Sequence, residues 1–346
     1  MLTPNSEKVL AFVKDHPGES SRVIYEGANV DASYATVKRI LVQLKEEGLI
    51  NARGRGRGTT YEVSQAYGLL FPIDSTEYFK KEIDEREIRD GYNFSLIDTL
   101  AAGVILFTDY EMSKIERLHD MYQKNISVLT SREYEKELER LAIDLSWKSA
   151  QIEGNTYSLL ETERLLKEKE TARGKKKEEA VMLLNHKDAL DFLFAEPNYI
   201  SPLTVSSLED VHSLLMKELD VPRNIRTGRV GITGTNYKPL DNEYQIKEEM
   251  RRMCDLINSR LHAFEKAFLV LLLISYLQPF VDGNKRTARI VSNAILLKYG
   301  YCPISFRTVS PLHYKKAILL FYEQNNLQAF KDIFIEQYEF SVKTYF

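Results

Sequence analysis

The sequence predicts a mainly α-helical protein in which a small α+β unit precedes a larger helical bundle with one β-hairpin. Apolar residues recur at helical spacing through almost all of the chain beyond Tyr92, whereas a glycine-rich stretch between two strand-like segments follows Gly48. Only residues 226–240 interrupt the later helices with a β-type alternation. The 346 residues, of which 44% are hydrophobic, suffice for two or three domains with real cores.

The composition limits the classes of partner. The 47 basic and 50 acidic residues leave a net charge of −3, so any contact with nucleic acid or anionic lipid has to be local. The longest apolar run, Ala267 to Leu277, falls short of the roughly 20 residues that cross a bilayer, and the N-terminus has no signal-peptide core. We expect a cytoplasmic protein without membrane contact, with Cys254 and Cys302 as core thiols.

Residues 1–66 predict the order helix, helix, helix, hairpin. The first helix surrounds Leu10 and the second covers residues 21–25. The third, capped by Asp31 or Ser33 and ended by Gly48, has apolar residues at i, i+3, i+4 and i+7: Val37, Ile40, Leu41 and Leu44. Residues 49–63 then suit two short strands joined by a mobile glycine-rich wing. This order resembles a winged helix-turn-helix domain, with residues 67–94 as the linker that follows it.

The cations of this first unit are clustered where such domains contact duplex DNA. The candidates are two residues of the third helix and three of the wing: Lys38, Arg39, Arg53, Arg55 and Arg57. Nine basic against eight acidic residues give the unit a balance of only +1. Use of the same unit for dimerisation or protein docking therefore stays open as the alternative to DNA binding.

Long amphipathic stretches predict the helices of the larger part. They cover residues 111–129, 134–153, 159–169, 178–194, 243–264, 265–277, 286–299, 311–324 and 327–342. The charge run at residues 171–179 predicts a solvated loop. Residues 226–240 alternate Val230 and Ile232 with small or polar residues and break at Gly234 and Pro239, which predicts a surface hairpin.

Residues 278–289, QPFVDGNKRTAR, lie between two apolar helices and predict a phosphate-binding loop. A loop that leads into a helix N-terminus offers unpaired backbone amides and the positive end of a dipole to an anion. Gly283 lets the backbone approach a phosphate, and Lys285, Arg286 and Arg289 bring three cations. Asp282 adds a carboxylate that suits Mg²⁺ held against those phosphates.

The loop resembles the signature of the Fic domain family, His-Pro-Phe-x-Asp-Gly-Asn-Gly-Arg-x-x-Arg, with two departures. Upstream, residues 149–155 (SAQIEGN) resemble the Ser/Thr-x-x-x-Glu-Gly/Asn inhibitory motif of the family, and residues 226–240 resemble its flap. The resemblance covers roughly residues 95–325, with an inhibitory helix near 146–156, and leaves 326–346 as a C-terminal helix. It implies a Fic-type helical bundle with a β-hairpin flap.

The resemblance also implies roles for individual residues. Asp282 would bind the divalent metal, and Asn284 with the amides around Gly283 would hold the α-phosphate. Arg286 and Arg289 would grip the outer phosphates of ATP. From its position at the end of the flap, Tyr237 is a candidate contact for the nucleotide or the target, and packing against the body is the alternative. The reaction would transfer AMP to a Ser, Thr or Tyr hydroxyl of a protein docked on the flap. Glu153, in one motif with Ser149, would pair with Arg289 and displace the γ-phosphate.

Two residues depart from the family pattern. Gln278 stands where the family has its histidine general base, and losing a positioned base costs on the order of 10²–10⁴ in rate. Lys285 replaces the second glycine and resembles the Doc branch, whose members phosphorylate their targets. Retention of Arg289 favours AMP transfer over that reaction. Removal of AMP is a third possibility, which Gln278 weakens.

Three hypotheses follow. The leading one is a Fic-type protein adenylyltransferase that uses ATP and Mg²⁺ and is inhibited by Glu153. The second is a catalytically inactive transcriptional regulator that binds DNA and senses a nucleotide or partner. The third is a scaffold that docks an extended peptide along the edge at residues 230–232. The sequence leaves the target, the DNA site and a homodimer open.

Overall fold

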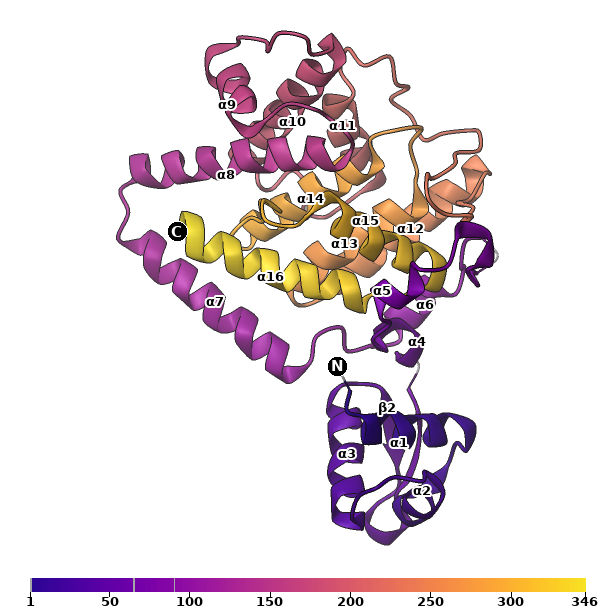
Figure 1. Cartoon of the computed structure of the whole chain (residues 1–346). Coiled ribbons are helices and arrows are strands. Elements are labelled where there is room, and N and C mark those ends of the chain that lie inside the picture. Colours follow the sequence, from indigo (N-terminus) through magenta and orange to yellow (C-terminus); the bar gives the residue numbers. More distant parts are fainter. Residues whose placement is uncertain (1, 65, 90) are drawn as a thin grey trace.

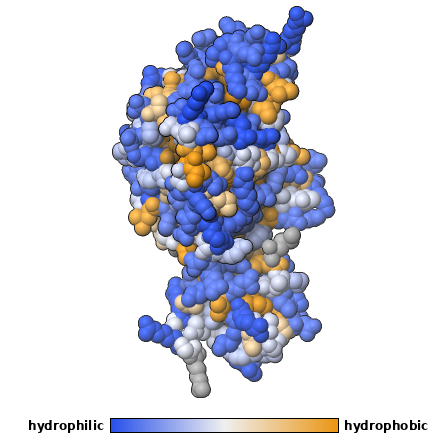
Figure 2. All heavy atoms as spheres, turned by 90° about the vertical axis from the view of Figure 1, so that its left-hand side faces the viewer, coloured by the Kyte–Doolittle hydropathy of each residue, from blue (hydrophilic) through white to orange (hydrophobic). Residues whose placement is uncertain are grey.

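The computed structural model describes residues 2–64, 66–89 and 91–346, without the side chain of Arg57. Figure 1 shows a small N-terminal unit beside a much larger helical body, as the predicted fold class requires. Figure 2 shows that the face turned to the viewer is mostly hydrophilic, with scattered apolar patches. No helix within the described ranges is long and apolar enough to cross a membrane.

The N-terminal unit consists of three helices and a three-stranded sheet of order β1-β3-β2. Its elements are α1 (Pro4–Asp15), β1 (Glu19–Ser20), α2 (Ser21–Gly27), α3 (Tyr34–Glu46), β2 (Ile50–Arg53), the 3₁₀ turn Gly56–Gly58 and β3 (Thr60–Val63). Ser33, rather than Asp31, caps α3, because its hydroxyl accepts a hydrogen bond from the Thr36 amide. The strand β1 was not predicted, since two residues carry no readable alternation.

The larger body is built from helices. They are α6 (Leu96–Ala101), α7 (Asp109–Ser127), α8 (Ser131–Ile152), α9 (Leu159–Glu168), α10 (Lys177–Ala195), α11 (Val205–Leu215), α12 (Glu243–Ser259), α13 (Ala263–Leu277), α14 (Asn284–Lys298), α15 (Pro311–Gln324) and α16 (Gln328–Tyr345). The longest connection between them, residues 216–242, lies between α11 and α12. Every predicted helix of this part is present. The helices α6 and α11 were not predicted.

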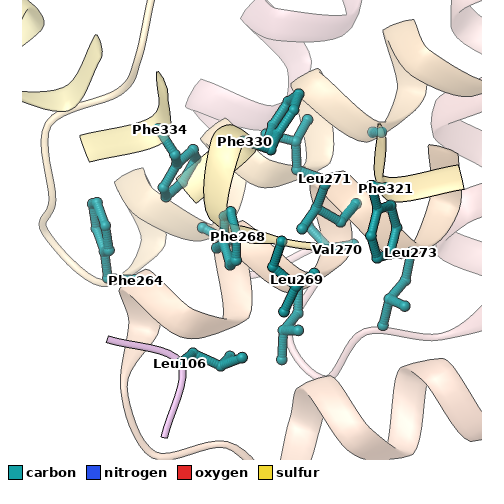
Figure 3. Packing of buried hydrophobic residues seen from close by; sticks show 14 of the residues in the cluster. Leu106, Phe264, Phe268, Leu269, Val270, Leu271, Leu273, Phe321, Phe330 and Phe334 are labelled. Carbon is teal, nitrogen blue, oxygen red and sulfur yellow. The ribbon is translucent and has the colours of Figure 1, made fainter. Parts of the chain in front are cut away.

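The core of the body is centred on α13, whose residues are buried all around the helix. Such a helix has no polar face because other helices cover it on every side. Figure 3 shows Phe264 and Phe268 of α13 near Phe334 of α16. The ring centroids of Phe264 and Phe334 are 4.8 Å apart. The C-terminal helix is therefore part of the same core as the helix that leads into the predicted phosphate-binding loop.

The segment predicted as a linker is folded against the body. It contains α4 (Tyr67–Leu70), α5 (Ser75–Tyr78) and the 3₁₀ turn Ile83–Glu85. The Tyr78 hydroxyl donates to a Glu323 carboxylate oxygen of α15 at 2.7 Å, and the Arg86 guanidinium lies 3.5 Å from the same carboxylate. We call residues 78–89 the strap, because they tie the segment after the N-terminal unit to α15.

The prediction of a β-hairpin over residues 226–240 needs correction. The chain turns back at residues 233–234, but within the described part of the flap neither arm is a strand. The carbonyls of Gly228 and Leu240, near the two ends of the flap, accept from the Arg226 guanidinium instead of from amides of the opposite arm, and Arg226 also donates to the Gln278 carbonyl of the body. The flap is an open, extended loop rather than a paired hairpin.

Candidate functional site

The loop between α13 and α14 comprises six residues, 278–283. Gln278 follows α13 in the left-handed region (φ 50°), and Gly283 precedes α14 with φ 81°. This positive φ favours glycine, and an added Cβ would also lie 2.5 Å from the flexible end of the Met216 side chain. In the described structure no side chain caps the first turn of α14. Its amides and the positive end of the helix dipole therefore face the loop.

Asn284 holds the loop in shape. Its amide nitrogen donates to the Phe280 carbonyl at 2.8 Å and to the Gln278 side chain at 3.0 Å, while its oxygen accepts from the Phe280 amide at 2.8 Å. The ring of His212 stacks on Phe280 at 3.8 Å and lies 2.9 Å from the Asp282 carbonyl. Burial lowers the pKa of His212, so the ring is neutral and donates through Nε2. These contacts preorganise the loop for a ligand.

Two buried arginines extend from α14 under the loop. Arg286 is 2% exposed and bonds Asp282 at 2.8 Å, while its Nε and Nη1 have no hydrogen-bond partner within the described residues. Arg289 is fully buried, and among the same residues its Nη1 is likewise unpaired. Buried donors almost always have partners in folded proteins. The two unpaired nitrogens of Arg286 therefore indicate an anion site, whereas the Arg289 guanidinium lies over the Tyr314 ring.

Glu153 contacts two cations of the predicted loop. One carboxylate oxygen lies 2.7 Å from Arg289 and the other 2.7 Å from Lys285. Although burial alone would raise the pKa of Glu153, Arg289 and Lys285 together hold it at about 2. Ser149, in the same motif, accepts from Arg289 through its hydroxyl and its carbonyl. The structure thus brings Glu153 and Arg289 together and adds Lys285, which the sequence did not foresee.

Gln278 is buried and both ends of its amide are engaged. Its Nε2 donates to the Ser275 carbonyl at 2.6 Å, and its Oε1 accepts from Asn284. The Gln278 carbonyl accepts from Arg226 at 2.6 Å. An amide has no useful basicity, and this one is also fixed in place. Gln278 therefore shapes the loop and offers no proton acceptor to a substrate.

A cavity of about 680 Å³ opens above the loop. Its walls are Glu153, flap residues 230–234, loop residues 281–286, and part of α15. The strap contributes a further wall through Phe79, Lys81, Glu82, Ile83 and Arg86. The volume lies within the range of small-molecule sites. Lys315 and Lys316 of α15 also line it, so the cavity is cationic well beyond the loop.

Tyr237 lies outside this cavity, which corrects its predicted role as a nucleotide contact. It is 2% exposed, and its hydroxyl donates to the Tyr276 carbonyl at 3.0 Å. Its ring stacks on Tyr276 at 4.8 Å. Tyr237 anchors the base of the flap to α13.

The cavity-wall residues on α15 and on the strap were not predicted from the sequence, because only the tertiary fold brings them to the loop.

The predicted DNA-contacting residues lie on the surface of the N-terminal unit. Lys38 and Arg39 project from α3 and are exposed, as is Arg55 in the wing. Arg53 pairs with Glu62 at 2.7 Å across the sheet, so part of its charge is already compensated. The side chain of Arg57 lies outside the described residues.

Comparison with known families and solved structures agrees with this geometry. Residues 202–296 match the model of the Fic/DOC family. A segment of 168 residues is 29% identical to the protein adenylyltransferase Fic of Nematostella vectensis, and one of 164 residues is 27% identical to that of Drosophila willistoni. These matches cover 46% of this chain but only 39% and 32% of those proteins. The chain thus spans about a third of the length of these relatives.

The solved structures show the same fold at low identity. Fic-1 (residues 134–508) from C. elegans superposes with a TM-score of 0.60 and 21% identity, covering 68% of this chain and 72% of that one. A Fic domain containing signaling protein from Bacteroides thetaiotaomicron gives a TM-score of 0.56 and 19% identity, over 67% of this chain and 95% of that one.

Proposed function

Because residues 202–296 form a Fic domain, we propose that the protein is a protein adenylyltransferase that Glu153 holds in an inhibited state. The observation that carries the proposal is the two unpaired buried nitrogens of Arg286, as far as the described residues go, at the cavity wall beside the first turn of α14. Arginine is well suited to phosphate because its planar fork makes two parallel hydrogen bonds. The names of the aligned relatives support AMP transfer as the reaction.

Different residues would bind the phosphates of ATP, the metal ion and the target. The amides around Gly283 and the Arg286 guanidinium would hold phosphate oxygens, and Asp282, whose side chain is 66% exposed, would hold Mg²⁺ against them. The metal would neutralise phosphate charge. A target segment carrying a Ser, Thr or Tyr hydroxyl would dock along residues 230–234 by strand addition. The open arms of the flap support this, since they form no ladder with each other in the described structure.

Glu153 inhibits by competition. A phosphate that approaches Arg289 and Lys285 has to displace a carboxylate already 2.7 Å from each of them. Replacing Glu153 by glycine would free both cations for the outer phosphates. The turnover would still be slow, because the position of the general base is occupied by a fixed amide, and its loss costs on the order of 10²–10⁴ in rate.

The test is incubation of the full chain with Mg²⁺ and either α-labelled or γ-labelled ATP, following label on protein. The proposal expects α-label that increases in Glu153→Gly and increases further in Glu153→Gly/Gln278→His. Incorporation of γ-label instead would indicate phosphate transfer. If label appears only in forms that carry Gln278→His, the protein is a nucleotide-binding pseudoenzyme.

A DNA-binding regulator is the second candidate. It is supported by the exposed cations of α3 and the wing and by the fixed amide of Gln278. The regulator hypothesis expects salt-dependent binding of the full chain to duplex DNA, weakened uniformly across sequences by Lys38→Ala and Arg39→Ala. A matched control is Arg22→Ala, since Arg22 pairs with Glu26 on α2. Equal binding by all three variants would remove the support for this function.

A further inference from the structure

Tyr322 on α15 is a fully buried residue of the cavity wall. Its hydroxyl has no hydrogen-bond partner within the described residues. The Gln278 amide nitrogen is close enough to interact with the Tyr322 oxygen and also donates to the Ser275 carbonyl. An N–H group can only donate, so the hydroxyl proton of Tyr322 is still left without an acceptor. An unpaired buried hydroxyl is costly, and at the wall of a ligand cavity the missing partner is most simply a group of the ligand.

The ring of Tyr322 is fixed by its surroundings. It stacks near Tyr237, with centroids 5.6 Å apart and planes at 26°, and lies 6.4 Å from Tyr276. The next residue, Glu323, is bound to the strap through Tyr78 and Arg86. The hydroxyl is therefore held at one place on the wall, and it would not have to be ordered again when a ligand binds.

The phenol keeps its proton near neutral pH and can therefore donate a hydrogen bond. Burial raises the pKa of Tyr322 well above its ordinary value, and the nearby charge of Glu153 adds to this effect. The group thus keeps its proton and needs an acceptor oxygen. Phosphate oxygens are strong acceptors, and the loop with its two arginines places phosphate at this cavity.

We propose that the Tyr322 hydroxyl donates a hydrogen bond to the phosphate group of the bound nucleotide that lies beside Gln278. The proposal rests on the nucleotide site described under the proposed function. Tyr322 is then a nucleotide-binding residue contributed by α15, well separated in sequence from the loop.

The test uses full-length protein carrying Glu153→Gly, so that Arg289 and Lys285 are released from the carboxylate in every sample. Tyr322→Phe removes one oxygen and keeps the ring. Tyr338→Phe is the matched control, because Tyr338 is also fully buried with a hydroxyl that lacks a partner among the described residues, yet it does not line the cavity. Calorimetry gives the Kd of ATP with Mg²⁺, and ³¹P NMR gives the chemical shifts of its bound phosphates.

We expect Tyr322→Phe to raise the Kd for ATP about tenfold, as for loss of a hydrogen bond to a charged group, and to move one bound phosphate resonance. Tyr338→Phe should change neither. The proposal is overturned if Tyr322→Phe binds ATP like its parent with coincident resonances, or if both variants lose affinity equally. If the Glu153→Gly parent itself binds no ATP, the nucleotide site and therefore the proposed function fail as well, a result distinct from the other two.

Discussion

At the scale of single residues, the main finding is that Glu153 contacts two cations rather than one. Lys285 occupies the position of a glycine in the family signature, and its ammonium lies 2.7 Å from the carboxylate. Under the proposed function, this lysine would therefore strengthen inhibition as well as contact phosphate. A carboxylate shared by two cations is harder for a phosphate to displace than one that pairs with a single arginine.

The low pKa of Glu153 predicts how its contribution depends on pH. Its value of about 2 in the folded protein lies below the roughly 4.3 of an unfolded glutamate, so the stabilisation is complete above pH 5 and is lost as the pH falls toward 2. We expect the difference in free energy of unfolding between wild type and Glu153→Gln to be constant from pH 5 to 8 and to shrink below pH 4. Urea denaturation measures it. A difference that already shrinks between pH 7 and 5 would contradict the assigned ion pairs.

The two cations should contribute unequally to stability. Arg289 is fully buried, whereas the Lys285 side chain is 26% exposed. Arg289→Met should lower the free energy of unfolding by about 3 kcal/mol, because it leaves a buried carboxylate poorly paired. Lys285→Met should lower it by about 1 kcal/mol or less. Urea denaturation of both variants measures which of them loses more free energy of unfolding. Equal costs would mean that the two contacts are equivalent.

At the scale of elements, the strap connects three parts of the site. Arg86 donates to the Gly234 carbonyl of the flap at 2.8 Å, and Asp84 accepts from Asn236 of the flap at 2.8 Å. The same strap holds Glu323 on α15 and lines the cavity. A change in the segment after the N-terminal unit would therefore reach the flap and α15 directly.

The Arg86–Glu323 pair should be important for stability. Both side chains are almost completely buried, at 4% and 0% exposed. Arg86→Met is expected to lower the free energy of unfolding by about 3 kcal/mol, because Glu323 loses its cation. The double variant Arg86→Met/Glu323→Met removes the orphaned charge and should recover much of that loss. Chemical denaturation of the wild type, Arg86→Met and the double variant measures these differences in free energy of unfolding. A cost below 1 kcal/mol for Arg86→Met would show that the strap is only loosely attached.

At the scale of the whole molecule, the sequence predicted the helices and loops that are specified by residues close together in the chain. The apolar run before Gln278 and the glycine with three cations after it specify a helix, a loop and a helix in consecutive residues. The stripe of Val37, Ile40 and Leu44 likewise specifies α3, which the structure places at Tyr34–Glu46. Such signals are readable because neighbours in the chain are neighbours in space.

What the sequence did not predict depends on contacts between distant segments. The strap and Glu323 are more than 200 residues apart in the chain, and no periodicity links them. The alternation of Val230 and Ile232 suggested strands, but carbonyls near the two ends of the flap accept from Arg226 instead. Tyr237 looked like a ligand contact because it is aromatic and close to a turn, whereas stacking on Tyr276 buries it.

Under the proposed function, this cavity binds nucleotide phosphates at a site which Glu153 occupies. Calorimetric titration of ATP with Mg²⁺ into the full chain and into Glu153→Gly tests this directly. We expect Glu153→Gly to bind at least tenfold more tightly, since Arg289 and Lys285 no longer have to exchange a carboxylate for a phosphate. Equal affinity in the two proteins, or binding by neither, would contradict the claim.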